Sequence, residues 1–301
     1  MEHRINDYKK AAKVHNSIRQ KLYQFVKPGI KLLDICEFIE SNIRTELPNE
    51  INSGIAFPVG VNLNNVAAHW SPQSNDTTVL GDDDVLKIDY GTHVNGNIID
   101  SAFTYTHNTH KYESLISASR EATNTVLKNV GVDSRIGELG AIAEEVVCSY
   151  EMDIYGRTIP LKPINNITGH SITQWNIHGG KLIPNIRNNN KTLIENNDIL
   201  AIEVYVTTGS GSVCVDGDVS HFMLKTKPPN DNSIMLGSLY EQFRTLPFCQ
   251  RYMNEPTNMS NYTDAIQSYP PLVELLDNSY ISQTEHTIHI NEYGNDIFSV
   301  D

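Results

Sequence analysis

The chain has 301 residues, a formal net charge of -13 and a hydrophobic fraction of 39%. This length is enough for one large domain or two small ones with a sizeable buried core. The acidic balance argues against general binding to nucleic acid or anionic membranes. The charged first residues lack the apolar run of a signal peptide, no segment is apolar over the length of a membrane span, and the 4 cysteines form no CxxC pair. We therefore expect a cytoplasmic protein with no direct nucleic-acid or membrane partner.

Two amphipathic helices are predicted at the start of the chain. Apolar residues recur at helical spacing over about 7–26, and the pattern ends at Lys27-Pro28-Gly29, a helix breaker followed by a turn former. Residues 32–43 repeat the pattern. The stretch 57–70 then reads as loop-rich, with small residues close to His69 that suggest a close approach of the backbone to another group.

A β-hairpin is predicted at residues 85–105. Asn95 and Gly96 tolerate the positive φ angles of a tight turn, and apolar residues flank them on both sides. If these two residues form the turn, Val94 pairs with Asn97, which fixes the register of the whole hairpin.

The rest of the chain alternates between helices and strands. Helices are predicted at about 111–130 and 137–150, a short strand pair with a loop at 154–168, and strands at 199–207 and 282–290. Periodic apolar residues suggest a helical insert at about 225–270. Because antiparallel hairpins replace a repeating βαβ order, the fold class is α+β, and we expect residues 1–301 to form a single catalytic domain with this insert.

Two aspartates in the hairpin are the most informative feature of the sequence. In the predicted register Asp89 lies opposite Ala102, so Asp100 shares its face of the sheet on the neighbouring strand. Carboxylates this close, among apolar residues, do not both stay ionised unless a cation lies between them. The pattern predicts a metal site; the alternative is a solvated hairpin with two surface acids.

Three further candidates lie in comparable settings. His170 follows a glycine after a loop, while Glu203 and Glu285 each lie in the middle of a predicted strand. A buried acid in a strand is costly unless it is paired or bound to a cation, although either Glu by itself fits a solvated strand face equally well. Together the two Asp, one His and two Glu form a thiolate-free set that suits Mn, Fe, Co or Zn.

These residues carry a resemblance to a known family. The motifs LKIDYG, IIDSAFT, GHSI, IEVY and TEHTI occur in the order found in the methionine aminopeptidases, and further blocks such as QWNIHGGK, SHF and YPPL are similar to the type 2 subfamily. The resemblance covers the chain from about residue 5 onward. It implies the pita-bread fold, a pseudo-symmetric arrangement in which a curved antiparallel sheet holds the metals, with the type 2 helical insertion between Glu203 and Glu285.

The resemblance also implies a role for each candidate. Asp89, Asp100, His170, Glu203 and Glu285 would hold two divalent metal ions (Co, Mn, Fe or Zn) that supply a hydroxide nucleophile. Glu203 would accept a proton from the water. His178 would donate to the scissile carbonyl group, and His69 would contact the peptide nitrogen. The implied activity is removal of the N-terminal methionine from nascent polypeptides whose second residue is small.

The methionine side chain needs an apolar slot. By resemblance its walls are Phe57, Ile177, His221 and Tyr269, although each of these also fits an ordinary core position. We expect a monomer that acts on nascent chains; association with the ribosome is left open because the chain lacks the long charged N-terminal extension of many eukaryotic members.

Two other functions remain open. A proline-directed peptidase of the same fold would share the five ligands, but such relatives usually carry a large N-terminal domain. A catalytically inactive relative that binds RNA or ribosomal partners would typically have lost metal ligands, whereas all five are present in this chain.

Overall fold

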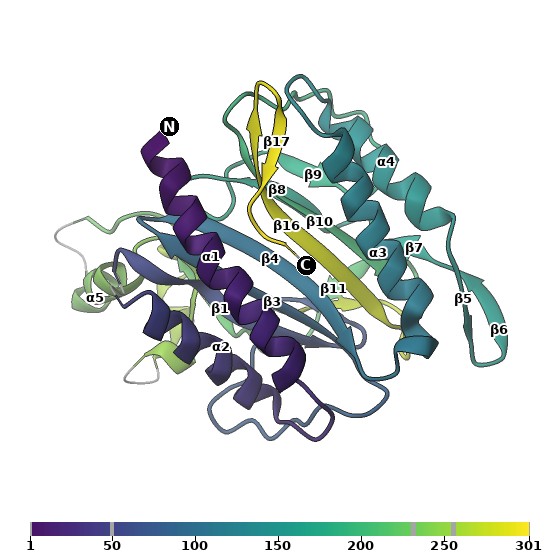
Figure 1. The fold of residues 1–301 in the computed structure, drawn as a ribbon. Helices are drawn as coiled ribbons and strands as arrows, with labels where there is room; N and C mark the ends of the chain where they lie inside the picture. Colours follow the sequence, from purple (N-terminus) through teal and green to yellow (C-terminus); the bar gives the residue numbers. More distant parts are fainter. Residues whose placement is uncertain (1, 49–50, 230–232, 254–256, 301) are drawn as a thin grey trace.

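The protein is an α+β structure, as predicted, in which helices cover antiparallel sheets (Figure 1). The computed structural model describes residues 2–48, 51–229, 233–253 and 257–300. Among these residues no helix is both long and apolar enough to cross a lipid bilayer.

The N-terminal half packs two helices on a three-stranded sheet. Helices α1 (Glu2–Phe25) and α2 (Leu32–Glu46) cover strands β1 (Ser53–Leu63), β3 (Val85–Val94) and β4 (Asn97–Thr106), which pair in the order β1-β3-β4. The apolar stripe of each helix faces this sheet and forms one continuous core with it.

The C-terminal half repeats this plan. Helices α3 (Thr109–Asn129) and α4 (Ile136–Cys148) pack on a six-stranded sheet and share a second core with it. Its strands pair in the order β17-β16-β10-β8-β9, with β7 also paired to β10; they are β7 (Lys162–Pro163), β8 (Thr168–Ile172), β9 (Leu182–Pro184), β10 (Ile199–Thr207), β16 (Ile281–Asn291) and β17 (Gly294–Ile297).

Strands β4 and β16 join the two halves through side chains. The Asp100 backbone N–H donates to Thr287 Oγ1 at 2.7 Å, and the Thr287 hydroxyl donates to the Asp100 carbonyl oxygen at 2.6 Å. The Ser101 hydroxyl donates to the Glu285 carbonyl oxygen. These hydroxyl groups fix the position of β4 relative to β16. The bonds involve the backbone of Asp100 and Glu285, which are two of the predicted metal ligands.

Smaller sheets complete the fold. The first pairs β11 (Val213–Val215), β15 (Leu272–Glu274) and β2 (Val66–Ala68). The second pairs β13 (Phe248–Cys249), β12 (His221–Leu224) and β14 (Ile266–Tyr269), and a hairpin is formed by β5 (Glu151–Ile154) and β6 (Arg157–Pro160).

The hairpin prediction is confirmed in its register. Val94 pairs with Asn97, and Asp89 lies opposite Ala102. Asn95 and Gly96 have φ angles of 52° and 72°, the left-handed conformations that a two-residue turn of this kind requires.

The prediction of a loop at 57–70 is wrong, because most of this stretch is extended. Strand β1 runs to Leu63, and β2 begins at Val66. Pro58 and Gly60 gave the segment its loop-like composition. They fit here because β1 is an edge strand whose pairing with β3 contains register shifts between Phe57 and Gly60.

The segment 225–270 is of mixed structure. Its described residues form helix α5 (Ile234–Phe243), the short 3-10 helices η1 (Gln250–Tyr252) and η2 (Met259–Tyr262), and strands β13 and β14. Residues 230–232 and 254–256 of the predicted insert lie outside the described part. The segment has a small apolar core of its own, to which α5 contributes Leu236 and Leu239.

Candidate active site

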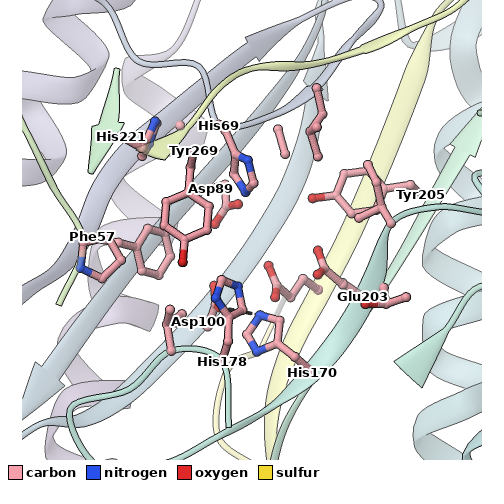
Figure 2. A pocket seen from close by; sticks show the side chains of 18 of the residues that line it. Phe57, His69, Asp89, Asp100, His170, His178, Glu203, Tyr205, His221 and Tyr269 are labelled. Atoms are coloured by element: carbon pink, nitrogen blue, oxygen red, sulfur yellow. Dashed lines mark ion pairs between the residues drawn. The ribbon is translucent and has the colours of Figure 1, made fainter. Parts of the chain in front are cut away.

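One cavity of about 300 Å³ collects every site residue predicted from the sequence (Figure 2). Its walls come from both sheets and from the two smaller ones. The predicted residues that line it are Phe57, His69, Asp89, Asp100, His170, Ile177, His178, Glu203, His221, Tyr269 and Glu285.

The strands place the five candidate ligands together. Asp89 and Asp100 lie on β3 and β4 of the first sheet, whereas His170, Glu203 and Glu285 lie on β8, β10 and β16 of the second. Glu203 and Glu285 are directly opposite in the β10–β16 ladder. One ligand atom each from Asp100, His170 and Glu285 lies within 4.8 Å of the others.

The short distance between β8 and β10 depends on a glycine. A side chain at Gly169 would place its Cβ 2.5 Å from the Ala201 carbonyl oxygen. Only glycine therefore fits before His170, which explains why this motif begins with Gly.

The acids of the cavity repel one another in a dry environment. Burial, opposed by a hydrogen bond from Gln283, raises the pKa of Asp89 to about 7, and burial together with the Asp89 charge raises that of Glu203 to about 8. For Asp100 and Glu285, burial first and the neighbouring carboxylates second raise the pKa well above its ordinary value.

The donor set fits divalent metal ions. Asp89 Oδ1 is buried without a hydrogen-bond partner, and no Lys or Arg is found among the described residues that line the cavity. Burial, and then the nearby His178, lower the pKa of His170 to about 3, so its imidazole is neutral and able to act as a ligand. An unpaired carboxylate oxygen and further buried carboxylates beside a neutral imidazole form a donor set that suits divalent cations.

A row of aromatic rings forms the other wall of the cavity. The ring centroids of His178 lie 4.7 Å from His170 and 5.7 Å from Tyr269, and Tyr269 lies 5.5 Å from His69. His221 follows at 6.1 Å from His69. Burial lowers the pKa of His69 to about 4, with a smaller effect from His178, so this wall is uncharged at neutral pH.

The Phe57 ring lies tightly against the backbone of β3. A Cβ at Gly91 would be 2.3 Å from Phe57 Cε1, so the glycine makes room for this ring at the cavity wall.

The sequence interpretation missed two residues of the site. Gln283 Nε2 donates to Glu203 Oε2 at 3.0 Å and lies 3.5 Å from Glu285 Oε2. Tyr205 lines the cavity, and its hydroxyl group points inward beside Glu203 (Figure 2). Each lies two positions from a predicted ligand on the same strand, so strand alternation was a signal that could have identified both.

Comparison with known sequences supports this picture. Residues 6–221 match the profile described as Metallopeptidase family M24. The chain belongs to metallopeptidase family M24. This membership makes the protein a metal-dependent peptidase, and Asp100, His170 and Glu285 form a group that could hold a metal ion.

A relative named methionine aminopeptidase 2, from Clavispora lusitaniae, is 41% identical over 309 residues that cover 97% of this chain and 71% of the relative. The resemblance to the type 2 subfamily is thereby confirmed.

Solved structures of the family share the fold. A structure described as a thermophilic Arx1 has a TM-score of 0.85 at 18% identity and covers 99% of this chain and 91% of its own. A methionine aminopeptidase from Thermotoga maritima has a TM-score of 0.72 at 19% identity, over 100% of this chain and 98% of its own. The predicted pita-bread fold is confirmed.

Proposed function

We propose that the protein removes the N-terminal methionine from polypeptides whose second residue is small, and that it uses two divalent metal ions. The observation that carries the proposal is the convergence of four carboxylates and one neutral histidine, from five strands of two sheets, in a single buried cavity. Such a set is unfavourable without cations, and it is the kind of oxygen-rich site that holds metal pairs.

Five side chains of the cavity are the proposed ligands of the two ions. Asp89, Asp100, His170, Glu203 and Glu285 would hold the ions. When bound, metal ions of this kind lower the pKa of water so that a nucleophile is present near neutral pH.

The other steps depend on the side chains of the chain itself. Glu203, which accepts a hydrogen bond from Gln283, would take a proton from the attacking water. His178, whose ring lies beside His170, would donate a hydrogen bond to the carbonyl oxygen of the bond to be cut, where negative charge develops. His69 lies farther along the wall and would contact the peptide nitrogen of the leaving group.

The residues at the far end of the cavity would recognise the first residue of the substrate. Phe57, Ile177 and Tyr269 supply apolar and aromatic surface for an unbranched thioether side chain, and His221 places a neutral imidazole there. The limited size of the cavity favours a small second residue.

The test is release of methionine from the peptide Met-Ala-Ser, with and without a chelator, by the wild type and by His170→Ala. We expect wild-type activity that EDTA abolishes and that Mn²⁺ or Co²⁺ restores, and we expect His170→Ala to lose most of it because the coordination shell is opened. His110→Ala is the matched control, because His110 is exposed on α3.

Two results would contradict the proposal. Cleavage of an Xaa-Pro dipeptide in preference to Met-Ala-Ser would indicate a proline-directed peptidase. Absence of bound metal by elemental analysis, together with absence of peptidase activity in Mn²⁺ or Co²⁺, would indicate an inactive relative.

A further inference from the structure

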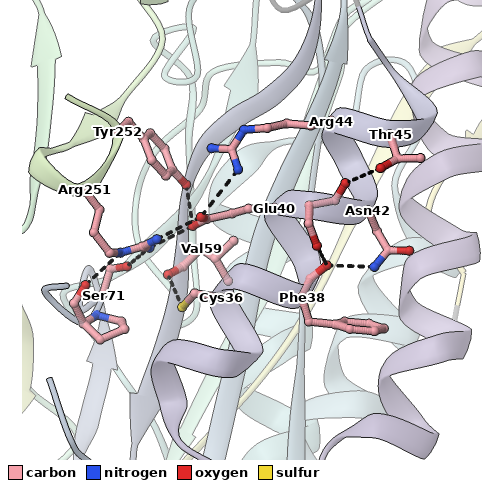
Figure 3. A network of polar contacts seen from close by, with 12 residues as sticks. Cys36, Phe38, Glu40, Asn42, Arg44, Thr45, Val59, Ser71, Arg251 and Tyr252 are labelled. Atoms are coloured by element: carbon pink, nitrogen blue, oxygen red, sulfur yellow. Dashed lines mark hydrogen bonds and ion pairs between the residues drawn. The ribbon is translucent and has the colours of Figure 1, made fainter. Parts of the chain in front are cut away.

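A buried ion pair lies between α2 and η1 (Figure 3). Arg251 Nη1 and Nη2 each lie 2.8 Å from a different carboxylate oxygen of Glu40, and the Tyr252 hydroxyl donates to Glu40 Oε1 at 2.8 Å. The side chains of Arg251 and Glu40 are 7% and 3% exposed. The pair therefore joins two distant parts of the chain by a buried, bidentate contact.

Arg251 also reaches the segment that follows His69. Its Nε donates to the Pro72 carbonyl oxygen at 2.9 Å, and Nη2 donates to Ser71 Oγ at 3.1 Å. A guanidinium group has a rigid, planar set of donors, so it fixes the position of Ser71 relative to Glu40.

Ser71 connects this contact to the cavity through Ser220. The Ser71 backbone N–H donates to Ser220 Oγ at 3.2 Å, and Ser220 Oγ lies 3.1 Å from the His69 carbonyl oxygen and 3.0 Å from His221 Nδ1. Ser220 thus contacts both the His69 backbone and the His221 ring, and its single hydroxyl proton can go to only one of these two acceptors at a time.

The contact with Pro58 favours one proton position on His221. Its Nε2 lies 3.3 Å from the Pro58 carbonyl oxygen, which can only accept, so a neutral ring carries its proton on Nε2. Nδ1 is then an acceptor that faces the Ser220 hydroxyl. On the other side α2 also contacts this part of β1, because Cys36 Sγ donates to the Val59 carbonyl oxygen at 3.6 Å.

Stability alone is a poor explanation for such an arrangement. A buried ion pair is often no more stabilising than apolar residues of the same volume, because desolvation offsets the attraction between the charges. His69, moreover, has a φ angle of 66°, a left-handed conformation that is unfavourable for a residue with a side chain and persists only where its surroundings enforce it.

We propose that Arg251 and Glu40 are positioning residues that act through Ser71 and Ser220, and that they hold His221 against the first residue of the substrate and His69 at the peptide nitrogen of the leaving group. The inference rests on the proposed function and adds to it: selection of methionine depends on a contact between α2 and the 225–270 segment, outside the cavity.

The test uses Arg251→Lys, which keeps the charge opposite Glu40 but cannot reach Ser71 and Pro72 at the same time. We expect kcat/KM for Met-Ala-Ser to fall about 10- to 100-fold, mainly through KM, and the preference for Met-Ala-Ser over Leu-Ala-Ser to fall with it. Bound metal should stay at the wild-type level. A merely structural role would lower kcat through a loss of folded enzyme and would leave KM and this preference unchanged, and that result would overturn the proposal.

Three further variants make the result specific. Arg44→Lys is the matched control, because Arg44 lies 4.0 Å from the same carboxylate on the exposed face of α2, and we expect wild-type kinetics from it. Ser71→Ala and Ser220→Ala remove single steps of the connection without disturbing the ion pair. They should reproduce the rise in KM, and they serve as the test if Arg251→Lys does not fold.

An NMR measurement separates this inference from the proposed activity. Imidazole nitrogen spectra of the metal-free protein, assigned with His221→Gln, should show the Nε2–H tautomer of His221 in the wild type and a changed signal in Arg251→Lys and Ser220→Ala. An unchanged signal would refute the positioning role even if the wild type releases no methionine. Conversely, a changed signal in a protein inactive on Met-Ala-Ser would leave the positioning role standing and refute only the proposed activity.

Discussion

Two buried glutamates, Glu274 on β15 and Glu285 on β16, are equally hidden from water but have opposite environments. Glu274 is 3% exposed and accepts hydrogen bonds from Thr207 Oγ1 at 2.7 Å, from the Ser210 backbone N–H at 2.9 Å and from its own neighbour, the Leu275 N–H, at 3.0 Å. Glu285 is 1% exposed, and among the described residues its carboxylate receives only the long 3.5 Å contact from Gln283.

The pKa values follow this difference. Burial raises the pKa of both carboxyls, but at Glu274 the hydrogen bonds from Ser210 and Thr207 outweigh burial and lower it. At Glu285 burial and the charges of Asp100 and Glu203 act in the same direction and raise it. Burial of an acid is therefore not itself a sign of a metal site; an acid that is buried without donors is such a sign.

The largest effect is expected from Glu285→Gln. It should lower kcat/KM for Met-Ala-Ser by at least about 100-fold, because a ligand is lost, and outer contacts alone are worth 10- to 100-fold. In the metal-free protein the same change should raise the melting temperature, since it removes a carboxyl group that must either take up a proton on folding or stay charged beside other carboxylates. Calorimetry with and without EDTA checks this expected rise in melting temperature. If the variant melted at a lower temperature than the wild type both with and without metal, Glu285 would be a stabilising buried acid like Glu274.

A smaller effect is expected from Gln283→Met. The variant loses the donor that holds Glu203 but keeps every ligand, so metal affinity should fall by about 10- to 100-fold. Competition with a chelator of known affinity measures the change. Activity should recover at high metal concentration, which distinguishes this variant from Glu285→Gln.

Metal removal should destabilise the wild type by a few kcal/mol. An ion present at 100 times its dissociation constant stabilises the folded state by about 2.7 kcal/mol. Differential scanning calorimetry should therefore show a lower melting temperature in EDTA and a reversal on addition of Mn²⁺ or Co²⁺. If EDTA left the melting temperature unchanged, the carboxylates of the cavity would be satisfied without cations.

The smallest effect on activity is expected from Glu274→Gln, the matched partner of Glu285→Gln. It should cost about 1–3 kcal/mol of stability through weakened hydrogen bonds and should leave kcat/KM per folded molecule unchanged. Because the pKa of Glu274 is lowered by folding, its stabilising effect is present above the unfolded value and is lost as the pH falls below 4.5. The difference between wild type and variant in urea titrations should accordingly shrink in acid.

Sequence patterns correctly predicted the features that depend on residues close together in the chain. The Asn95-Gly96 turn set the hairpin register, and with it the shared face of Asp89 and Asp100, because turn geometry and strand alternation are short-range rules. The same rules misread 57–70, since they do not show that β1 is an edge strand able to tolerate Pro58.

Contacts between segments far apart in the sequence could not be predicted from these short-range rules. The Glu40–Arg251 pair joins positions 211 residues apart, and neither residue lies in a motif that indicates a partner. Strand alternation could have identified Gln283 as a site residue, since it shares a strand face with Glu285. Its hydrogen bond to Glu203 could not be predicted in this way, because it depends on how β10 and β16 pair.

The origin of the ligands in both sheets has a consequence for synthesis of the enzyme. Asp89 and Asp100 are made early, but the cavity lacks one of its five proposed ligands until Glu285 on β16 has been translated and docked beside β4. We therefore expect a nascent copy that ends anywhere before β16 to be catalytically silent.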